Sequence, residues 1–600
     1  MTRHAALLCA VATLAFAASA GLSQDSPAPK EEPEPIKQAP RPLDPRAHRV
    51  GELIADVAFT DVEGKQGKLS DFQGKPLVVA LTNTTCPICK KYAPTLAELH
   101  AELEKKDAAM LLVNPSAADS AEKIKEAIAR CKFTSRYVHD AKGEFAAALG
   151  ANSTGDCFLL DGARTLIYRG AVDDQYGLGY AVDAPRHNYL RDAVAALLAG
   201  GRSYTAATWA PGCEIEPGPA PRPGEITWHN RVSRIIQGNC QECHRKGEPG
   251  PFELATLEDV KAHVPTIQRV VRQGAMPPWT ADPQTGHWHN DRSLSSRDKA
   301  DLLAWIDGGM KPGDEKDAAL PRQWPPGWRI GTPDATAQSA KHKVPARGIQ
   351  PYVYSMAKTN FGEDKWVQAM EIRPSAPQAV HHVLIFLQYP ADHPRAGEQP
   401  EDQFGVKGYF MGMVPGQGHI VFPPGQGKFV PKGASMFFQV HYTPNGEECE
   451  DQTTLGMIWC KERPRAEVHT RGIAQLRFRI PPGADNHEVQ SSQRLEAPIR
   501  VLSLMPHMHL RGKAYRFGVE YADGRKETLL DVPRYDFNWQ FVYILREPID
   551  LPAGARIRCT GWFDNSDRNP ANPDPKAEVR WGEQTWQEMQ IGYVNYIKLE

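Results

Sequence analysis

The spacing of apolar and polar positions divides most of the chain into three stretches. From about 48 to 203, β-like runs such as "KPLVVALTN" alternate with helical patterns such as "YAPTLAELHAELEKK", which predicts an α/β domain. Between about 224 and 315, three amphipathic segments ("WHNRVSRIIQGNC", "TLEDVKAHVPTIQRVVRQG" and "SSRDKADLLAWIDGG") predict a small all-α domain. From about 341, apolar alternation returns in runs such as "HHVLIFLQY" and "SMFFQVHYTP", which predicts two antiparallel β-sandwich domains, over 341–462 and 463–600.

The N-terminal residues lack these periods. Residues 1–20 have the pattern of a secretory signal peptide, with Arg3 and His4 before an apolar run that ends in "ASA". Residues 21–47 are dominated by Pro, Glu and Lys, which predicts a disordered linker. No later stretch approaches the roughly 20 apolar residues of a membrane-spanning helix. We therefore expect an exported protein, periplasmic or secreted, with no integral membrane segment after signal cleavage.

Length and charge exclude some classes of protein. At 600 residues the chain is too long for a single hydrophobic core, so several functions can share it. Lys plus Arg (70) and Asp plus Glu (72) nearly cancel, so no excess of basic charge attracts nucleic acid, and no nucleic-acid partner is expected.

The motif "TNTTCPICKKYAPTL" sets Cys86 and Cys89 between an apolar strand and a predicted helix, where the helix terminus favours a thiolate. With Pro94 and the approach "KQGKLSDFQGKPLVV" at 65–79, it makes residues 50–200 resemble the thioredoxin-like redoxins. This resemblance implies a redox-active pair. The family's cis-proline is missing, since Gly155 and Asp156 precede Cys157. Alternatives are a static disulfide, a second pair of Cys131 with Cys157, or Cu(I) held by these thiols.

The motif "CQECHRKGEPGPF" contains Cys240, Cys243 and His244 in a C-x-x-C-H run. This spacing predicts one covalent haem c, with thioethers from both cysteines and His244 as an axial iron ligand. The alternative, a zinc site, would need a second pair of ligands, which the nearby sequence lacks. Met276 is the preferred sixth ligand, with His263, His287 and His289 as alternatives. The segment 229–313 resembles small cytochrome c domains, which implies a one-electron relay.

Histidines recur in the β-like runs of the last 260 residues. His507 and His509 are two apart, so on a strand both imidazoles point the same way and can share a metal. His381 and His382 are adjacent, so a shared metal requires a bulge or a strand end. A single buried histidine is usually structural. The prediction of metal sites therefore rests on the several histidines of these runs taken together.

The motifs "VHHVLIF", "QVHYTPNG", "PHMHLRGK", "YDFNWQ" and "EMQIGYVNY" make residues 341–600 resemble the copper type II, ascorbate-dependent monooxygenases. The resemblance implies two copper ions facing each other across a solvent-filled cleft between two jelly-roll-like sandwiches. It places an electron-transfer copper on His381, His382 and His441. It places the oxygen-activating copper on His507, His509 and Met589, whose soft thioether favours Cu(I).

These parts predict an exported copper monooxygenase that hydroxylates a C–H bond of a small-molecule or peptide substrate with O2. The haem domain relays electrons from an external donor, ascorbate-like or a redox protein, and the thioredoxin-like domain serves in thiol redox or copper handling. The alternative is a haem and copper electron-transfer or copper-binding protein without oxygenase activity. A thiol-disulfide oxidoreductase with incidental C-terminal modules ranks last. Cys449 and Cys460 are expected to form a structural disulfide, whereas Cys213 and Cys559 receive no role.

Overall fold

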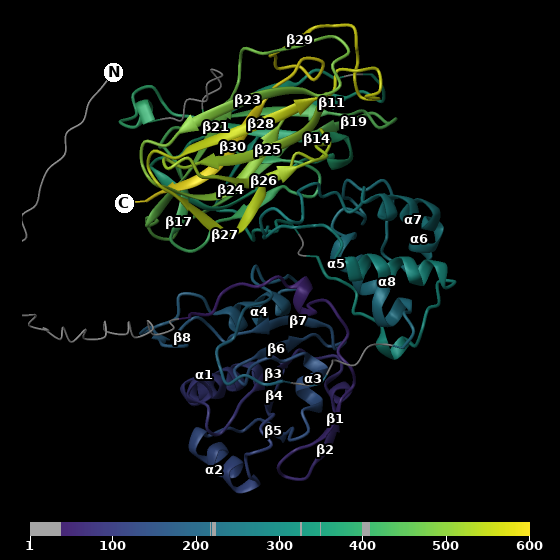
Figure 1. Ribbon diagram of the computed structural model, residues 1–600, viewed down its shortest axis with the longest axis vertical. Coiled ribbons are helices and arrows are strands. Elements are labelled where there is room, and N and C mark those ends of the chain that lie inside the picture. Colours follow the sequence, from purple (N-terminus) through teal and green to yellow (C-terminus); the bar gives the residue numbers. More distant parts are fainter. Residues whose placement is uncertain are drawn as a thin grey trace, which may run out of the picture.

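The computed structural model describes residues 38–216, 218, 224–324, 327–348, 350–398 and 408–599. It contains an α/β body at one end, a β-rich body at the other and a group of helices beside their junction (Figure 1). The predicted signal peptide and the predicted linker as far as residue 37 lie outside the described residues. No helix in the described ranges is long and apolar enough to cross a membrane.

The disorder predicted for residues 38–47 is wrong. Gln38 bridges Leu178, Pro42 bridges Thr208, and a short 3-10 helix follows at Arg46–His48. The Arg46 side chain forms a 2.6 Å ion pair with Asp291, beyond the α/β body. Composition favours disorder here, but backbone pairing with distant strands orders the segment, and local sequence carries no signal for such contacts.

The α/β body has one five-stranded sheet in the order β5-β4-β3-β6-β7. Its strands are β3 (Leu77–Leu81), β4 (Ala109–Asn114), β5 (Arg136–His139), β6 (Cys157–Leu160) and β7 (Leu166–Gly170). Its helices are α1 (Pro87–Glu104), α2 (Ala121–Cys131), α3 (Glu144–Leu149) and α4 (Tyr189–Leu198). The short strands are β1 (Ala58–Thr60), β2 (Gln66–Lys68), β8 (Tyr176–Gly177) and β9 (Tyr180–Ala181). Strands β3 and β4 run parallel whereas β6 is antiparallel to β3, so the predicted α/β sheet is a mixed one.

The segment predicted to be helical contains a π-helical turn at Trp228–Val232, then α5 (Ser233–Asn239), α6 (Leu257–Ala262), α7 (Val264–Gln273) and α8 (Ser296–Asp307). The middle predicted helix is thus divided at His263, just before Pro265, whose ring disfavours continuation of a preceding helix. The loop between α7 and α8 crosses to the β-rich body, where Trp279 and Trp288 join its core.

Three large sheets build the two predicted sandwiches, and one of these sheets runs through both sandwiches. A nine-stranded sheet runs β10-β20-β13-β17-β21-β30-β24-β27, with β16 pairing β13. It passes from one half to the other through a parallel contact of Gln426 with Ala466. One half is closed by the sheet β12-β18-β14-β15 and the other by β23-β28-β25-β26.

The strands of the first half are β10 (Ala335–Gln338), β11 (His342–Val344), β12 (Val353–Lys358), β13 (Lys365–Arg373), β14 (Val380–Gln388), β15 (Tyr409–Met413), β16 (His419–Val421), β17 (Gln426–Val430), β18 (Ser435–Tyr442), β19 (Cys449–Asp451) and β20 (Thr454–Trp459). Those of the second half are β21 (Ala466–Ala474), β22 (Arg479–Ile480), β23 (His487–Arg494), β24 (Ile499–His507), β25 (Gly512–Glu520), β26 (Lys526–Val532), β27 (Tyr543–Leu551), β28 (Arg556–Phe563), β29 (Val579–Arg580) and β30 (Ile591–Lys598).

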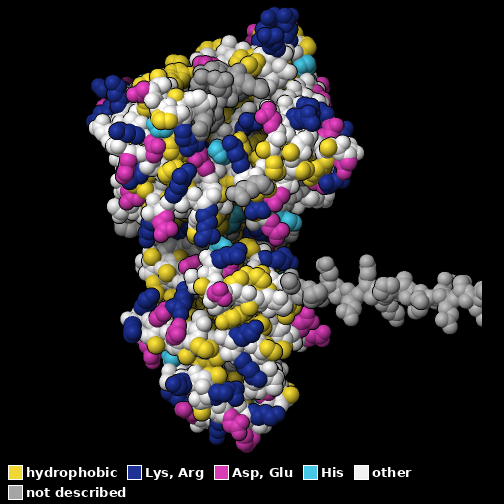
Figure 2. Space-filling view, turned by 90° about the vertical axis from the view of Figure 1, so that its left-hand side faces the viewer, with side chains coloured by type: hydrophobic (Ala, Val, Ile, Leu, Met, Phe, Trp, Pro, Cys, Tyr) yellow, Lys and Arg dark blue, Asp and Glu magenta, His cyan; other side chains and the backbone are white. Residues whose placement is uncertain are grey.

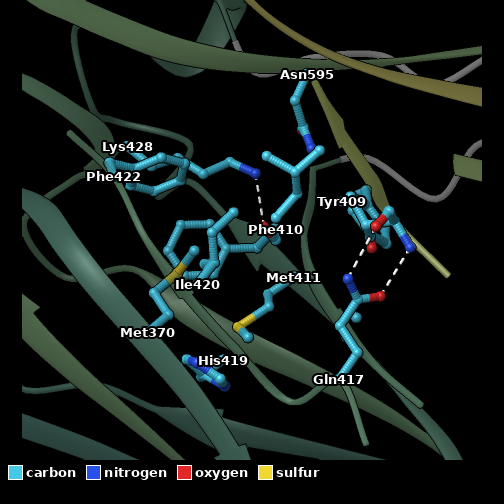
Figure 3. A pocket seen from close by; sticks show the side chains of 13 residues that line it. Met370, Tyr409, Phe410, Met411, Gln417, His419, Ile420, Phe422, Lys428 and Asn595 are labelled. Atoms are coloured by element: carbon cyan, nitrogen blue, oxygen red, sulfur yellow. Dashed lines mark hydrogen bonds between the residues drawn. The ribbon is translucent and has the colours of Figure 1, made fainter. Parts of the chain in front are cut away.

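A buried polar chain joins the halves. The Lys428 ammonium donates to the Phe410 carbonyl at 2.6 Å (Figure 3). It also donates to Thr470 Oγ1 at 2.8 Å. Thr470 in turn donates to Asn595 Oδ1, and Asn595 donates to Ser503 Oγ at 2.8 Å. Burial lowers the pKa of Lys428 to about 7. These side chains link β17, β21, β30 and β24, so the two halves are held as one unit.

The predicted disulfide between Cys449 and Cys460 is wrong, because both are free thiols. Cys449 pairs with Val344 in the two-stranded sheet β11-β19. The Cys460 sulfur lies 3.7 Å from the Gln426 carbonyl, beside the nine-stranded sheet. Each cysteine therefore belongs to a different sheet, which their closeness in sequence does not reveal.

Candidate functional site

Three histidines meet where β14 and β18 pair. The register shifts between Val380 and His382, so His381 is the bulged residue that the sequence required. His382 is then paired directly with His441 on β18. The bulge rotates the adjacent His381 toward its neighbours, and one ligand atom from each of the three rings lies within 4.8 Å of the other two. Across the described ranges, no other group of three or more His, Cys, Asp or Glu residues meets this criterion.

Hydrogen bonds select which nitrogen of each ring is available. His381 Nε2 lies 3.0 Å from Asn538 Oδ1, an acceptor, so this nitrogen carries the proton. His381 Nδ1 is then unprotonated and lies 3.0 Å from His382 Nδ1. His382 Nε2 and His441 Nδ1 are buried without a hydrogen-bond partner.

Burial keeps these imidazoles neutral. It lowers the pKa of His441 to about 3, with the nearby His381 ring as a further cause, and it lowers the pKa of His382 well below its usual value. A buried polar nitrogen without a partner costs free energy, and a neutral imidazole nitrogen is a common metal ligand. The three-histidine cluster therefore fits a metal ion that accepts imidazole ligands.

The second histidine pair lies at the end of β24. His507 is the last residue of the strand and is paired with Ile591 on β30, whereas His509 lies two residues beyond the strand. The two rings are nevertheless neighbours, with centroids 5.3 Å apart and planes at 90°. The two rings are therefore neighbours, as their spacing predicted, although His509 lies beyond the end of the strand.

Hydrogen bonds also fix one ring nitrogen, Nδ1, of His507 and of His509. His507 Nδ1 donates to Gln540 Oε1 at 2.5 Å, and His509 Nδ1 donates to the Gln587 carbonyl at 3.2 Å. Both Nε2 atoms are thereby left unprotonated, and His509 Nε2 is buried without a partner. Burial lowers the pKa of His507 to about 4. This pair also fits a metal ion.

Glu588 fastens the Met589 segment to the histidine pair. Its carboxylate oxygens accept from the His509 amide at 2.8 Å and from the Arg511 amide at 2.6 Å. Burial raises the pKa of Glu588 to about 8. Met589 follows directly and packs beside the apolar cluster that contains Met505 and Ile591. Sequence reasoning missed Glu588, although its position before Met589 in "WQEMQ" was visible.

The segment 535–540 stands between the two histidine groups, and here the structure differs from the implied cleft. The Phe537 ring lies 5.0 Å from that of His381 and 6.0 Å from those of His441 and His509. An aromatic side chain therefore lies against both groups, where the resemblance implied a solvent-filled cleft. Its neighbours Asn538 and Gln540 hold His381 and His507, so one loop orients both sites, a role that the sequence motif did not reveal.

Asn538 orients His381 and Gln540 orients His507, so a substitution of either residue serves as the control for a substitution of the other. Asn538→Ala is expected to weaken copper binding at His381, His382 and His441, and Gln540→Leu at His507 and His509, each by about 10–100-fold. Copper titration followed by calorimetry and Cu(II) spectroscopy would resolve the two sites. Equal weakening of both sites by either variant, with unchanged melting of the metal-free protein, would contradict this assignment.

The C-x-x-C-H motif lies at the end of α5. Cys240 and Cys243 are free, half-buried thiols, and His244 Nδ1 donates to the Phe252 carbonyl at 3.0 Å, which leaves Nε2 as its available nitrogen. The Phe252 ring stacks on His263 at 3.9 Å. The role of Met276 as an iron ligand stays a prediction. The free thiols and the oriented imidazole fit a covalent haem.

The third site is the thiol pair. Cys86 caps α1 and Cys89 lies in its first turn; both are buried and free. A hydrogen bond from the Cys89 thiol lowers the pKa of Cys86 to about 4, with further hydrogen bonds from Thr154 and the Cys213 amide. The pKa of Cys89 is raised well above its usual value by the same interaction and by burial. The pair thus has one thiolate and one protonated thiol.

The sequence allowed Cys131 and Cys157 either to pair with each other or to share a metal with Cys86 and Cys89, and the structure shows neither arrangement among the described residues. Cys131, at the C-terminal end of α2, and Cys157, in the middle of the sheet, are both free, so the suggested second pair is wrong. The two also form no compact metal cluster with Cys86 and Cys89 among the described residues. Burial raises the pKa of Cys157 far above its usual value, which makes it an inert core thiol.

Comparison with known proteins identifies the α/β body. A model of the AhpC/TSA family matches residues 50–171. The thiol-disulfide oxidoreductase ResA of Geobacillus thermodenitrificans (strain NG80-2) is 28% identical over 113 residues, which are 19% of this chain and 63% of that protein. ResA of Bacillus thuringiensis subsp. konkukian (strain 97-27) is 26% identical over 112 residues, 19% of this chain and 64% of that protein. The chain thus spans less than two thirds of the length of these relatives.

Two solved structures are similar to part of the chain. A hypothetical protein from Sinorhizobium meliloti 1021 is 26% identical, with a TM-score of 0.27, and the match covers 30% of this chain and 99% of that one. An uncharacterized conserved protein from Geobacillus kaustophilus is 24% identical, with a TM-score of 0.25 and coverage of 29% and 95%. The family match and the ResA relatives identify residues 50–171 as a thioredoxin-like redoxin domain of the thiol-disulfide oxidoreductase type.

Proposed function

We propose that this chain, whose redoxin domain is similar to thiol-disulfide oxidoreductases, is an exported copper-dependent monooxygenase that hydroxylates a C–H bond of an organic substrate with O2. The observation that carries the proposal is the cluster of His381, His382 and His441, with ligand atoms within 4.8 Å of one another beside the His507–His509 pair. Neutral, buried imidazoles with unpartnered nitrogens suit copper in either oxidation state.

The residues divide into two ligand sets. His381, His382 and His441 would hold one copper, and His507, His509 and Met589 the other. Bound copper would supply the single-electron transfers and the O2 activation that hydroxylation needs. Asn538 and Gln540 keep the ligand nitrogens unprotonated, and the Phe537 ring lies against histidines of both sets. Glu588 fastens the segment of Met589, a soft ligand, to His509.

The helical segment would supply the electrons, because it contacts the half of the β-rich body that carries the three-histidine site. A Cβ on Gly416, whose φ is +83°, would lie 3.0 Å from the Cys243 sulfur, so only glycine permits this approach. Arg292 donates to the Gly416 carbonyl. The next residue, Gln417, lines a cavity together with His382 and Gln540. Cys240, Cys243 and His244 would hold haem c, which would supply single electrons, and the loop of Gly416 and Gln417 connects these residues to the three-histidine site.

The remaining parts complete the proposal. The predicted signal peptide supports export, where a covalent haem and copper are compatible with an oxidising compartment. The redoxin domain would exchange disulfides through Cys86 and Cys89. Charged side chains of both signs are intermixed over the face shown in Figure 2, in keeping with a small organic or peptide substrate rather than a nucleic acid.

The test is metal and haem content of the purified mature chain, followed by oxygen uptake with ascorbate and a panel of amines and peptides. We expect about two coppers and one haem per chain. We also expect substrate-dependent uptake that Met589→Ile abolishes while the haem content is unchanged. Haem without copper, or copper without substrate-dependent uptake, would leave the competing function, an electron-transfer or copper-binding protein.

A further inference from the structure

A segment from beyond the redoxin match covers the thiol pair. Residues 210–215 run antiparallel to the loop 152–155, through a bridge of Glu214 with Ser153. The Thr154 amide donates to the Cys213 carbonyl at 2.9 Å, and the Cys213 amide donates to Thr154 Oγ1 at 2.9 Å. A Cβ on Gly155 would lie 2.0 Å from the Pro211 carbonyl oxygen, so glycine at this position permits the contact.

This pairing sets three sulfurs in a row. The Cys213 and Cys89 side chains both lie near enough to Cys86 for it to shift their pKa values. Thr154 connects the two sides, because its carbonyl accepts from the Cys89 thiol at 3.2 Å and its hydroxyl accepts from the Cys213 amide at 2.9 Å. The exposures differ sharply along this row. Cys86 and Cys89 are 1% and 6% exposed, whereas Cys213 is exposed to solvent. A large disulfide in solution therefore meets Cys213 before it can reach the pair.

We propose that Cys213 is a third redox-active thiol, which passes disulfides between solvent and the buried Cys86–Cys89 pair. The inference rests on the proposed thiol-disulfide exchange at that pair and extends it. A purely structural role does not require a cysteine here, because the hydrogen bonds of the Cys213 carbonyl and amide to Thr154 do not involve its sulfur. Its carbonyl and amide would hold the segment in place with any small side chain.

The exchange balances without a further reactant. The pKa of Cys213 is raised by burial and by the neighbouring Cys86, so its thiol first gives its proton to water. The sulfur then attacks an external disulfide, R–S–S–R′, to form a mixed disulfide, and R′–S⁻ leaves and takes a proton from water. The Cys86 thiolate then attacks the Cys213 sulfur and releases R–S⁻, which is also protonated. Cys89 loses its proton, attacks Cys86 and frees Cys213. The external disulfide has gained two electrons, and the pair is oxidised to a Cys86–Cys89 disulfide. An external dithiol reverses the sequence.

The thiol chemistry of the row is suited to this order. Because the pKa of Cys86 is lowered to about 4, it is a thiolate at neutral pH and can attack Cys213 without a separate base. A thiol of low pKa is also a good leaving group when the disulfide moves on from it. Cys213 is the member that solvent can reach, so its sulfur can react with a large external partner.

The test uses the full chain with Cys213→Ser, which keeps the backbone contacts, and Cys131→Ser as a matched control. We expect Cys213→Ser to slow reduction of a protein disulfide, insulin, by about 10-fold or more, with the redox potential of the Cys86–Cys89 pair unchanged. Cys131→Ser should reduce insulin at the wild-type rate. In Cys89→Ser, mild oxidation should yield a Cys86–Cys213 disulfide, identified by peptide mass spectrometry.

The outcomes separate this inference from the function on which it rests. If Cys213→Ser reduces insulin as fast as wild type, or faster, and Cys89→Ser yields no Cys86–Cys213 disulfide, Cys213 is not an exchange thiol, although the pair remains active. If wild type itself does not reduce insulin, thiol-disulfide exchange at the pair is wrong and the inference is overturned with it.

Discussion

His382→Ala is expected to remove one of the two coppers and to reduce substrate-dependent oxygen uptake to background. His382 is paired with His441 across the strands and shares the cluster with His381, so its loss leaves at most two imidazoles. Two imidazole ligands bind copper far more weakly than three. The stabilisation of the folded protein by bound copper is lost when copper no longer binds. Copper content after dialysis and the oxygen-uptake rate measure the effect.

A thermal shift distinguishes lost copper from lost folding. Copper at about 100 times its dissociation constant should stabilise wild type by about 2.7 kcal/mol, and His382→Ala by markedly less. His487→Ala, which removes a half-buried histidine at the start of β23, is the matched control and should retain copper and uptake. Wild-type copper content in His382→Ala would contradict the three-histidine site.

Cys86→Ser is expected to abolish disulfide reduction by the redoxin domain. Cys86 is the only member of the thiol row that contacts both of the others, and its hydrogen bonds with Cys89, Thr154 and Cys213 favour the thiolate form. A serine hydroxyl in the same place is not ionised at neutral pH and cannot form a disulfide. Insulin reduction measures the loss, and Cys131→Ser, at the end of α2, should leave it unchanged.

The same substitution should change how stability depends on pH. The pKa of Cys86 in the folded, reduced domain is about 4, below that of an unfolded cysteine near 8.5. The folded thiolate therefore stabilises the reduced domain fully above about pH 8.5, and this contribution is lost as the pH falls toward 4. Urea unfolding of reduced wild type and Cys86→Ser should differ most at high pH and converge near pH 4. A constant difference would contradict the thiolate.

Local pattern was sufficient for several features of this protein. The alternation of apolar residues predicted the α/β, helical and β-rich stretches, because strand and helix periods are set by the backbone itself. The spacing of His507 and His509 predicted neighbouring rings, which the structure confirms. A metal shared by the adjacent His381 and His382 required a bulge or a strand end, and the structure has a bulge there. The C-P-I-C motif predicted the thiol pair at the start of α1.

The features that complete the sites depend on contacts between residues far apart in the chain. Phe537 lies against histidines more than 90 residues away from it in the chain and against the His507–His509 pair. Cys243 meets Gly416, and Cys213 meets Cys86, through loops whose sequences carry no periodic signal. The continuity of the two sandwiches likewise depends on the single parallel contact of β17 with β21.

The sequence by itself therefore determined the kinds of chemistry this protein carries: a thiol pair, a C-x-x-C-H motif and two histidine groups, each encoded within a few residues. The tertiary structure alone decided what surrounds them. It placed Phe537 where a cleft was expected, ordered residues 38–47 and set Cys213 over the thiol pair. The physical reason is that periodicity reports the local backbone, whereas burial, tautomer and access to solvent are set by whichever distant segment packs against each site.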